Sequence, residues 1–386
     1  MFSYASRRVP FIVASILALA CSAPSTEDLV DAGEPVEDEL GAQVVDLGAD
    51  QSDTTVDRAA IPLDVSQVTG LVDLRGVGDS GWANTHQGTP RAAAFGTALD
   101  AFDPSGTVLR GHLSYINWET VVGESCTQFA SRYVPGKSYA FISRVENLRQ
   151  AEAHGFNLVG LSNNHSRDCS VPSAEALTAR NMPDALSAAA LWAGIRADGK
   201  GSQDIKLGSF DVGEGLTAKV AFASAYIGSR RDCDMAVCAS DLPELLKRLA
   251  TSDADYRILS LHSMDGATQA ELARVGADAV RTLKVDVVYG SGPHVWKPVQ
   301  VVERNDGTKG VVFQSLGNFL HPSLAAQGKN YMGRALFSRD HALKQVQLVP
   351  IRNVADRASL SDVPGSVVPA NLAWRAMPKG VFANVK

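Results

Sequence analysis

Apolar runs of five to seven residues recur along the chain from about residue 61 and alternate with amphipathic stretches. The runs predict buried strands, because they are short and rich in Val, Ile and Leu. They cover residues 71–77, 112–116, 156–161, 218–223, 256–261 and 285–289. Between them, apolar residues at helical spacing predict helices over residues 143–154, 173–190, 242–250 and 268–283. This alternation of strands and helices predicts an α/β core.

Two further runs predict a β-hairpin. Residues 298–303 and 310–314 read as strands and flank Asn305, Asp306 and Gly307. Asn, Asp and Gly tolerate the left-handed backbone that tight hairpin turns require.

A polar residue suited to metal binding or proton transfer follows five of the predicted strands. Strand ends in an α/β sheet can gather on one edge, so such residues can share a site. One of them alone would be ordinary turn chemistry, whereas five in the same register predict a site. The residues are Asp79, Glu119, Asn164 with His165, His262, and His294. The densest cluster is Leu-Ser-Asn-Asn-His-Ser-Arg-Asp at 161–168, which by itself is better explained as turn-forming residues and a satisfied histidine.

The net charge of −6 is unevenly distributed. Residues 21–60 contain eleven acidic residues and one arginine, so the rest of the chain is close to neutral. Nothing in this balance indicates a surface that binds nucleic acid. Residues 22–60 also lack the apolar content needed for a core, which predicts a disordered acidic tether. The folded domain is therefore expected over 61–386.

The first 21 residues have the pattern of an export signal. Arg7 and Arg8 precede an apolar stretch, residues 11–20, that is too short to span a bilayer comfortably. The sequence Ala-Leu-Ala-Cys at 18–21 resembles a bacterial lipobox and predicts lipidation of Cys21. A plain cleaved signal peptide is the alternative. We expect an exported protein that is lipid-anchored to the bacterial cell envelope.

In their order and spacing, these motifs resemble the capsule synthesis protein CapA family, also called the poly-γ-glutamate synthesis PgsA family, relatives of the calcineurin-type metallophosphoesterases. The resemblance covers about residues 70–325. It implies an α/β (α+β) fold with a calcineurin-like β-sheet sandwich flanked by helices and a metal pocket at the strand ends. The matching pieces are Gly78-Asp79, Asn117-Trp118-Glu119, Asn163-Asn164-His165 with Asp168, His262, residues 290–294 and 315–319, and the approach at 153–159.

The resemblance also implies roles for individual residues. Asp79 and Glu119 would be carboxylate ligands, with Glu119 bridging, and Asn164 an amide oxygen ligand. His262 and His294 would be imidazole ligands. His165 would be the catalytic acid beside the substrate. Weaker expectations for substrate contact fall on Asn117, Asp168, Ser291 and Asn318. The cofactor would be one or two divalent ions, which could be Mn, Zn, Fe or Mg.

Two departures from the family pattern matter. After His262 the family usually has Trp-Gly and then an acidic residue, whereas this chain has Ser-Met-Asp-Gly. Asp265 either replaces that acidic residue or caps the next helix. Ser291 stands where the family often has a histidine, so one ion would be held weakly, or the pocket would bind without catalysis.

Besides Cys21 the chain has four cysteines. An even number in an exported protein favours disulfides, with free buried thiols as the alternative. If Glu119 and His165 share a pocket, the cysteines that follow them are close together. The predicted pairs are Cys126–Cys169 and Cys233–Cys238.

The resemblance favours a role in synthesis, export or anchoring of a capsular poly-γ-glutamate-type polymer, with a metal-dependent hydrolase pocket. The expected partners are a capsule synthase or export machinery in the membrane. One alternative is an exported metal-dependent phosphoesterase with a small substrate. The other is a non-catalytic binding protein with a degenerate metal site.

The substitution Cys21→Ser tests the predicted anchor. It removes the thiol that a lipid would modify, and several acyl chains are needed for stable membrane attachment. We expect the variant to leave the membrane fraction or to be mislocalised. Fractionation and the mass of the mature N-terminus measure this. A wild-type protein that is soluble after export, with its mature end elsewhere than Cys21, would contradict the prediction.

Overall fold

The computed structural model of the protein describes ten segments of the chain. The segments are residues 63–84, 90–126, 139–169, 174–196, 205–228, 235–321, 327–354, 357–360, 366–367 and 381–384. The chain divides into a unit of residues 1–48 and a unit of residues 49–386, and every described residue belongs to the second. The predicted export signal, Cys21 and the acidic tether lie outside the described residues and stay predictions.

The first sheet has nine strands within the described residues, and β1 lies in its interior. The strand order is β16 (Ser366–Val367), β17 (Val381–Asn384), β14 (Leu343–Val354), β13 (Gln327–Ser338), β1 (Leu71–Ser80), β2 (Leu113–Trp118), β5 (Leu158–Gly160) and β6 (Leu191–Ala193), with β15 (Arg357–Leu360) paired to β14. Strands β1, β2, β5 and β6 run parallel. The long strand β13 pairs antiparallel with β1, and β14 pairs antiparallel with β13; neither strand was predicted.

The second sheet has six strands in the part of the chain that the structure describes. Its order is β11 (Trp296–Glu303), β12 (Lys309–Leu316), β10 (Val287–Ser291), β9 (Tyr256–His262), β8 (Thr217–Tyr226) and β7 (Lys206–Asp211). Strands β8, β9, β10 and β12 are parallel. The antiparallel pair β11–β12 confirms the predicted hairpin. A small separate sheet pairs β3 (Val121–Val122) with β4 (Ile142–Ser143).

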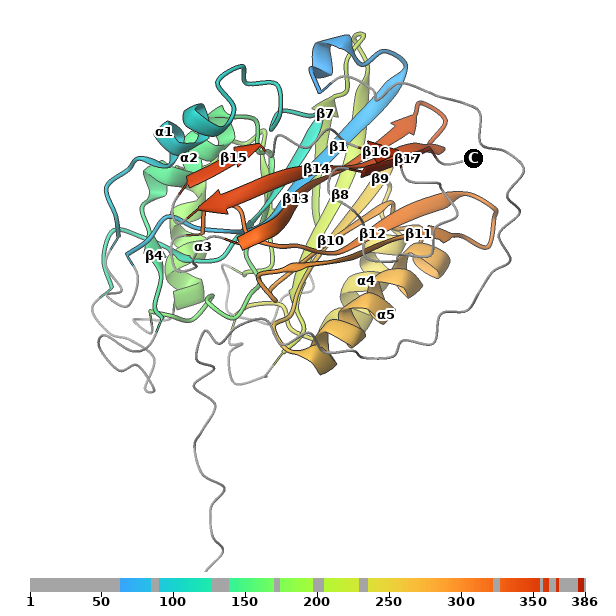
Figure 1. Ribbon diagram of the computed structural model, residues 1–386. Coiled ribbons are helices and arrows are strands. Elements are labelled where there is room, and N and C mark those ends of the chain that lie inside the picture. Colours follow the sequence, from blue (N-terminus) through green and yellow to red (C-terminus); the bar gives the residue numbers. More distant parts are fainter. Residues whose placement is uncertain are drawn as a thin grey trace, which may run out of the picture. The chain divides into compact units, whose positions relative to one another are not determined.

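Helices cover the outer side of each sheet (Figure 1). The short 3-10 helix η1 (Val65–Gln67) precedes β1. Helices α1 (Phe95–Phe102), α2 (Val145–Ala153) and α3 (Ala174–Ala185) pack on the first sheet, and α4 (Leu242–Ala250) and α5 (Gly266–Leu283) on the second. Helix α3 is shorter than predicted, because the Ser187 N–H donates to a Glu152 carboxylate (2.9 Å) instead of continuing the helix.

The two sheets pack face to face through one apolar core. Alternate residues of β1 and β2, such as Leu74 and Tyr115, share a buried cluster with Phe222 of β8 and Ile258 of β9. Burial of such side chains is the main stabilising contribution, about 1.5–3 kcal/mol for each large one. The predicted sandwich flanked by helices is therefore confirmed. The strands that precede the predicted site residues were expected to end at one edge of a single sheet. They are instead divided between the two sheets, and their ends meet across the sandwich.

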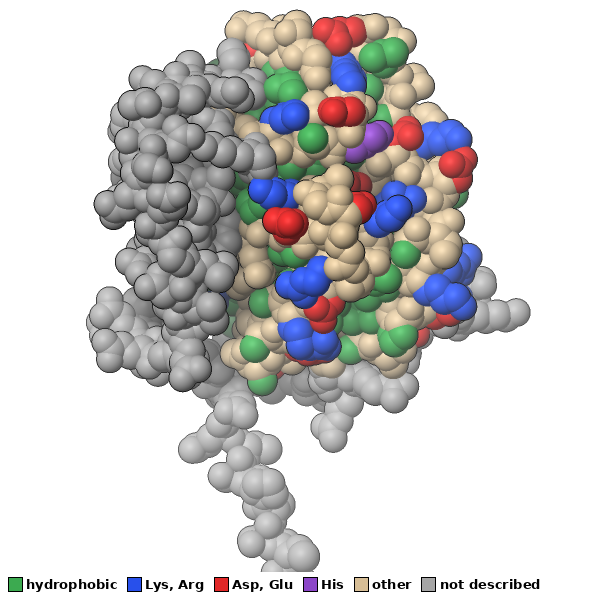
Figure 2. Space-filling view, turned by 90° about the vertical axis from the view of Figure 1, so that its right-hand side faces the viewer, with side chains coloured by type: hydrophobic (Ala, Val, Ile, Leu, Met, Phe, Trp, Pro, Cys, Tyr) green, Lys and Arg blue, Asp and Glu red, His purple; other side chains and the backbone are tan. Residues whose placement is uncertain are grey.

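The surface carries both signs of charge. Figure 2 shows basic and acidic side chains interspersed over the described part of one face, without a large area of a single sign there. No described helix is long and apolar enough to cross a membrane.

A buried ion cluster ties the amino-terminal half of β1 to β13. The Asp73 carboxylate accepts hydrogen bonds from Arg75 and Arg334, with closest distances of 2.7 and 2.6 Å. All three side chains are at most 1% exposed. Burial alone would raise the pKa of Asp73, but the two guanidinium groups outweigh it and lower that pKa. The cluster holds two positive charges on one carboxylate.

The substitution Asp73→Asn should destabilise the fold by about 3–5 kcal/mol, because it leaves two buried guanidinium groups without a counter-charge. The folded-state pKa of Asp73 lies below its unfolded value. The contribution is therefore fully present above about pH 4 and is lost as the pH falls through the folded-state pKa. Denaturant unfolding measures this change. The exposed pair of Asp253 with Lys219 provides the control, and Asp253→Asn should change stability far less, because solvent screens this pair. Equal effects of the two substitutions would contradict the assignment.

Candidate metal centre

The predicted ligands converge where strand ends of the two sheets meet. Asp79, Glu119 and His262 are completely buried. One ligand atom from each of Asp79, Glu119 and His294 lies within 4.8 Å of the others. His262 Nε2 is 2.7 Å from Asn164 Oδ1 and 3.6 Å from Glu119 Oε1. The five side chains predicted to bind metal thus form one cluster.

A β-bulge in β1 turns Asp79 toward the second sheet. Residues of β1 alternate between the inner core and the helix-covered side, and Val77 lies on the helix side. Strict alternation would place Asp79 on the same side as Val77. The pairing with β2 shifts by one residue at Gly78, between Val77 and Asp79. The shift turns Asp79 inward, where the Gly292 N–H lies 3.0 and 3.1 Å from its two carboxylate oxygens.

The segment that follows β12 is hydrogen-bonded to the backbone of Asp79. The Asp79 N–H donates to Gly317 O (2.9 Å), and the Phe319 N–H donates to Asp79 O (2.8 Å). Only glycine fits at position 78, since a Cβ there would overlap the carbonyl oxygen of Gly317. This pairing brings Asn318 to His294, where Asn318 Oδ1 lies 3.0 Å from Nδ1.

Asp79 is a well-satisfied carboxylate. Besides the Gly292 N–H, it accepts a hydrogen bond from Asn117 Nδ2 (2.9 Å), and His294 Nδ1 lies 3.0 Å from Oδ2. Burial alone would raise the pKa of Asp79, but the hydrogen bond and charge of His294 outweigh burial and hold the pKa well below its ordinary value. Asp79 is therefore ionised, and its negative charge can attract a cation.

Glu119 is satisfied much less well. It is 0% exposed, and no described donor forms a hydrogen bond to either carboxylate oxygen. Burial, and then the negative charge of Asp79, raise the pKa of Glu119 well above its ordinary value. A buried carboxylate without donors is costly unless a cation binds it. The donor set around it, two carboxylates with imidazole and amide groups, fits a divalent ion of the kind expected from the sequence.

His262 is held by neighbours on both ring nitrogens. Nδ1 lies 2.9 Å from Ser291 Oγ, and Nε2 lies 2.7 Å from Asn164 Oδ1. Burial lowers the pKa of His262 to about 3, so the ring is neutral at ordinary pH and can offer a lone pair to a metal. Ser291 is completely buried and its hydroxyl contacts this proposed ligand. Ser291 therefore orients His262 in this structure. Asn117 Nδ2, 3.3 Å from Nδ1, lies on the same side of the ring.

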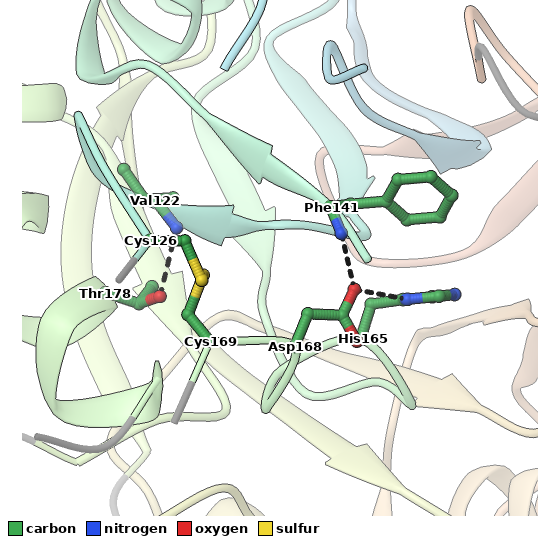
Figure 3. The surroundings of a disulfide bond; sticks show 7 residues. All are labelled: Val122, Cys126, Phe141, His165, Asp168, Cys169 and Thr178. Atoms are coloured by element: carbon green, nitrogen blue, oxygen red, sulfur yellow. Dashed lines mark hydrogen bonds and ion pairs between the residues drawn. A yellow bond between two sulfur atoms is a disulfide. The ribbon is translucent and has the colours of Figure 1, made fainter. Parts of the chain in front are cut away.

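His165 and Asp168 form a dyad beside the proposed ligands (Figure 3). His165 Nδ1 lies 2.6 Å from Asp168 Oδ2, and that oxygen also accepts the Phe141 N–H at 2.7 Å. The Phe141 ring packs against the His165 ring with centroids 4.5 Å apart. His165 Nε2 lies 3.9 Å from Glu119 Oε1, so it faces the proposed ligands. The Asp168 contact fixes the orientation of the imidazole.

The residue after Asp168 is bonded to Cys126, as predicted (Figure 3). The disulfide links Cys169 to the segment that follows β3, and the Val122 N–H of β3 donates to Thr178 of α3 (3.1 Å). Cys238 is also disulfide-bonded. Cys233 lies outside the described residues, so the pair Cys233–Cys238 stays a prediction.

The position of Asp265 settles one expectation from the sequence. Asp265 is exposed and caps α5, since its carboxylate accepts the Thr268 N–H at 2.8 Å. Of its two interpretations, the helix cap is correct. Sequence reasoning missed His321, which is 1% exposed and lies with Nε2 3.7 Å from Glu119 Oε2. Its signal was a histidine after a strand and a Gly-Asn turn, the arrangement that marked the other site residues.

Comparison with known proteins gives one family match and two structural likenesses. The family model for the bacterial capsule synthesis protein PGA_cap matches residues 78–323, more than half of the chain. A crystal structure described as a novel phosphatase from Mycoplasma pneumoniae is similar with a TM-score of 0.42 and 12% identity, covering 74% of this chain and 95% of that one. A hypothetical protein from Thermus thermophilus is similar with a TM-score of 0.40 and 15% identity, covering 73% of this chain and 100% of that one. No curated protein matches the chain closely enough to count as a relative.

The matched span begins one residue before Asp79 and ends two residues after His321, so it contains the whole cluster described above. The chain belongs to the bacterial capsule synthesis protein family PGA_cap.

Proposed function

We propose that this protein is an exported, lipid-anchored, metal-dependent hydrolase or transferase that acts in the synthesis, export or anchoring of a capsular polymer of the poly-γ-glutamate type. The bond that it hydrolyses or transfers would be an amide or a phosphate ester. Its partners would be a capsule synthase or export machinery in the membrane. Family membership supports the capsular role, and the cluster at the strand ends supports the chemistry.

The observation that carries the chemistry is the pair of buried carboxylates. Asp79 and Glu119 are both completely buried, and Glu119 has no hydrogen-bond donor among the described residues. Two carboxylates so placed repel each other unless one is protonated or a cation lies between them. Imidazole and amide groups complete the surroundings and leave coordination places for water. A divalent ion held by Asp79, Glu119, Asn164, His262 and His294 would polarise a substrate oxygen and activate water near neutral pH.

Other residues of the chain would donate a proton and orient the ligands. Asp168 Oδ2 accepts a hydrogen bond from His165 Nδ1–H, which leaves Nε2 directed toward Glu119. When the ring is doubly protonated, Nε2–H would give its proton to the leaving group as the bond to it breaks, and the ring would remain as neutral imidazole with its proton on Nδ1. Asn318 orients His294, and Ser291 orients His262, so that both rings keep their positions when substrate binds.

Ser291 also favours a second candidate function. Its hydroxyl is a poorer metal ligand than imidazole and is already bonded to His262. With one position weakened, the pocket would bind an ion and a polymer without turnover. A third candidate is an exported phosphoesterase. It differs from the polymer hydrolase and from the polymer-binding protein because its substrate is a small molecule. Deletion of the gene separates the phosphoesterase from the other two candidates, because loss of capsule supports a role in the polymer and a normal capsule contradicts it.

Two substitutions in the pocket should have different effects. Glu119→Ala removes the carboxylate shared by the cluster, so we expect loss of bound metal. His165→Ala leaves the ligands in place, so we expect wild-type metal content and a turnover lower by about 10²–10⁴-fold. Metal analysis of the purified protein, with assays on p-nitrophenyl phosphate, bis-p-nitrophenyl phosphate and poly-γ-glutamate, measures both quantities.

Asp286→Ala is the matched control for Glu119→Ala. Asp286 is also a buried carboxylate, but it pairs with Arg304 (2.6 Å) at the opposite end of β10. It should lower stability and keep the metal. Full metal loading of Glu119→Ala would refute the ligand assignment. Loaded wild-type protein that is inactive in every assay would favour the binding function.

Metal affinity should rise with pH. The raised pKa of Glu119 means that the chelator-treated protein keeps a proton on this carboxylate above its ordinary range, and an entering ion must displace that proton. The neutral His262 needs no deprotonation. We therefore expect release of about one proton per ion at low pH, falling toward zero as the pH passes the pKa of Glu119. Calorimetric titration in buffers of different ionisation enthalpy counts these protons, and pH-independent affinity would contradict the expectation.

A further inference from the structure

His321 lies just after β12, beside two of the proposed ligands. Its side chain is 1% exposed, and its Nε2 lies 3.7 Å from Glu119 Oε2. Its ring centroid is 5.3 Å from that of His294. A buried imidazole therefore stands next to a carboxylate and a second imidazole that already belong to the centre.

The two oxygens of Glu119 face different histidines. Oε1 lies 3.6 Å from His262 Nε2, and Oε2 lies 3.7 Å from His321 Nε2. These separations are too long for hydrogen bonds. Ligand atoms that share one ion at about 2.0–2.2 Å each are separated by roughly 3–4 Å. Both contacts therefore have the spacing of two ligands around an ion.

The backbone that carries His321 is fixed to the site. Hydrogen bonds on both sides of Asp79 hold Gly317 and Phe319 against it. Leu320 then adopts a left-handed φ of 52°, which a bulky aliphatic residue rarely does. Strain of this kind is found at ligand sites, where the surrounding contacts enforce it. His294, whose ring centroid lies 5.3 Å from that of His321, has a φ of 57°.

We infer that His321 is a metal ligand, and that it supplies the imidazole that the centre lacks at Ser291. Ser291 Oγ is 2.9 Å from His262 Nδ1 and so acts on a ligand. Glu119 would then join two groups of ligands, one through Oε1 with His262 and Asn164, the other through Oε2 with His321. This inference rests on the proposed metal-dependent function and adds to it a ligand from the end of the matched family region.

The competing explanation is that His321 is a packing residue. The Phe141 ring meets the His321 ring edge-on at 5.2 Å, so part of its surroundings is apolar. A packing role predicts that substitution changes stability and leaves metal affinity unchanged. A ligand role predicts that substitution weakens metal binding, whether or not stability also changes.

The first experiment measures Zn(II) affinity by chelator competition in the full-length protein. His321→Gln should weaken binding by about 100-fold or more, because even residues that only orient ligands contribute about 10–100-fold. His154→Gln is the matched control. His154 follows α2 and pairs with Asp100 on the surface, so its loss should change affinity by less than about twofold. Wild-type affinity in His321→Gln overturns the inference.

A second measurement does not depend on the variant folding. In crystals of wild-type protein loaded with Zn(II), anomalous diffraction locates the ion. A ring nitrogen of His321 at about 2.0–2.1 Å from zinc supports the inference, and a distance beyond about 3 Å overturns it.

Different results would contradict the proposed metal-dependent function and the role of His321. If wild-type protein binds none of Zn(II), Mn(II), Fe(II) and Mg(II), the proposed metal-dependent function fails together with the role of His321. If zinc binds through Asp79 and Glu119 without His321, the proposed function stands and only the inference fails.

Discussion

Two carboxylates buried side by side are the constraint around which this structure is arranged. Asp79 is satisfied by the Gly292 N–H, Asn117 and His294, whereas Glu119 has no described donor. The apolar surroundings make each negative charge more costly and also make its attraction to a cation stronger. The same burial that raises the pKa of Glu119 therefore favours a site for a divalent ion at the end of the sandwich.

Packing between the two sheets holds the two carboxylates in position. Tyr115, Tyr289 and Phe313 stack between the sheets, with ring centroids 4.7 and 5.5 Å apart. The Tyr115 hydroxyl lies 2.7 Å from Ser260 Oγ, two residues before His262 on β9. A close-packed core of this kind limits movement of the strand ends. At the other end of β1, the Asp73 ion cluster joins β1 to β13.

The proposed proton donor is held in place by contacts of its own. His165 is oriented by Asp168, and Asp168 is held by Phe141 and followed directly by the disulfide from Cys169 to Cys126. None of these contacts involves a proposed metal ligand. Proton transfer and metal binding therefore depend on different interactions, although Glu119 lies within 4 Å of both His165 and His262.

The sequence by itself determined most strands and helices, because their apolar periods are set by local spacing, and it determined which residues follow the strands. On β9 the alternation that buries Tyr256 and Ile258 also directs His262 inward. The tertiary structure decided three things. Pairing between distant segments put the strands into two sheets and added β13 and β14. The bulge at Gly78 reversed the side of Asp79 that alternation predicts. Hydrogen bonds that the Asp79 backbone donates to Gly317 and accepts from Phe319 brought His321 next to Glu119. Each of these depends on contacts between residues far apart in the chain, which no local pattern encodes.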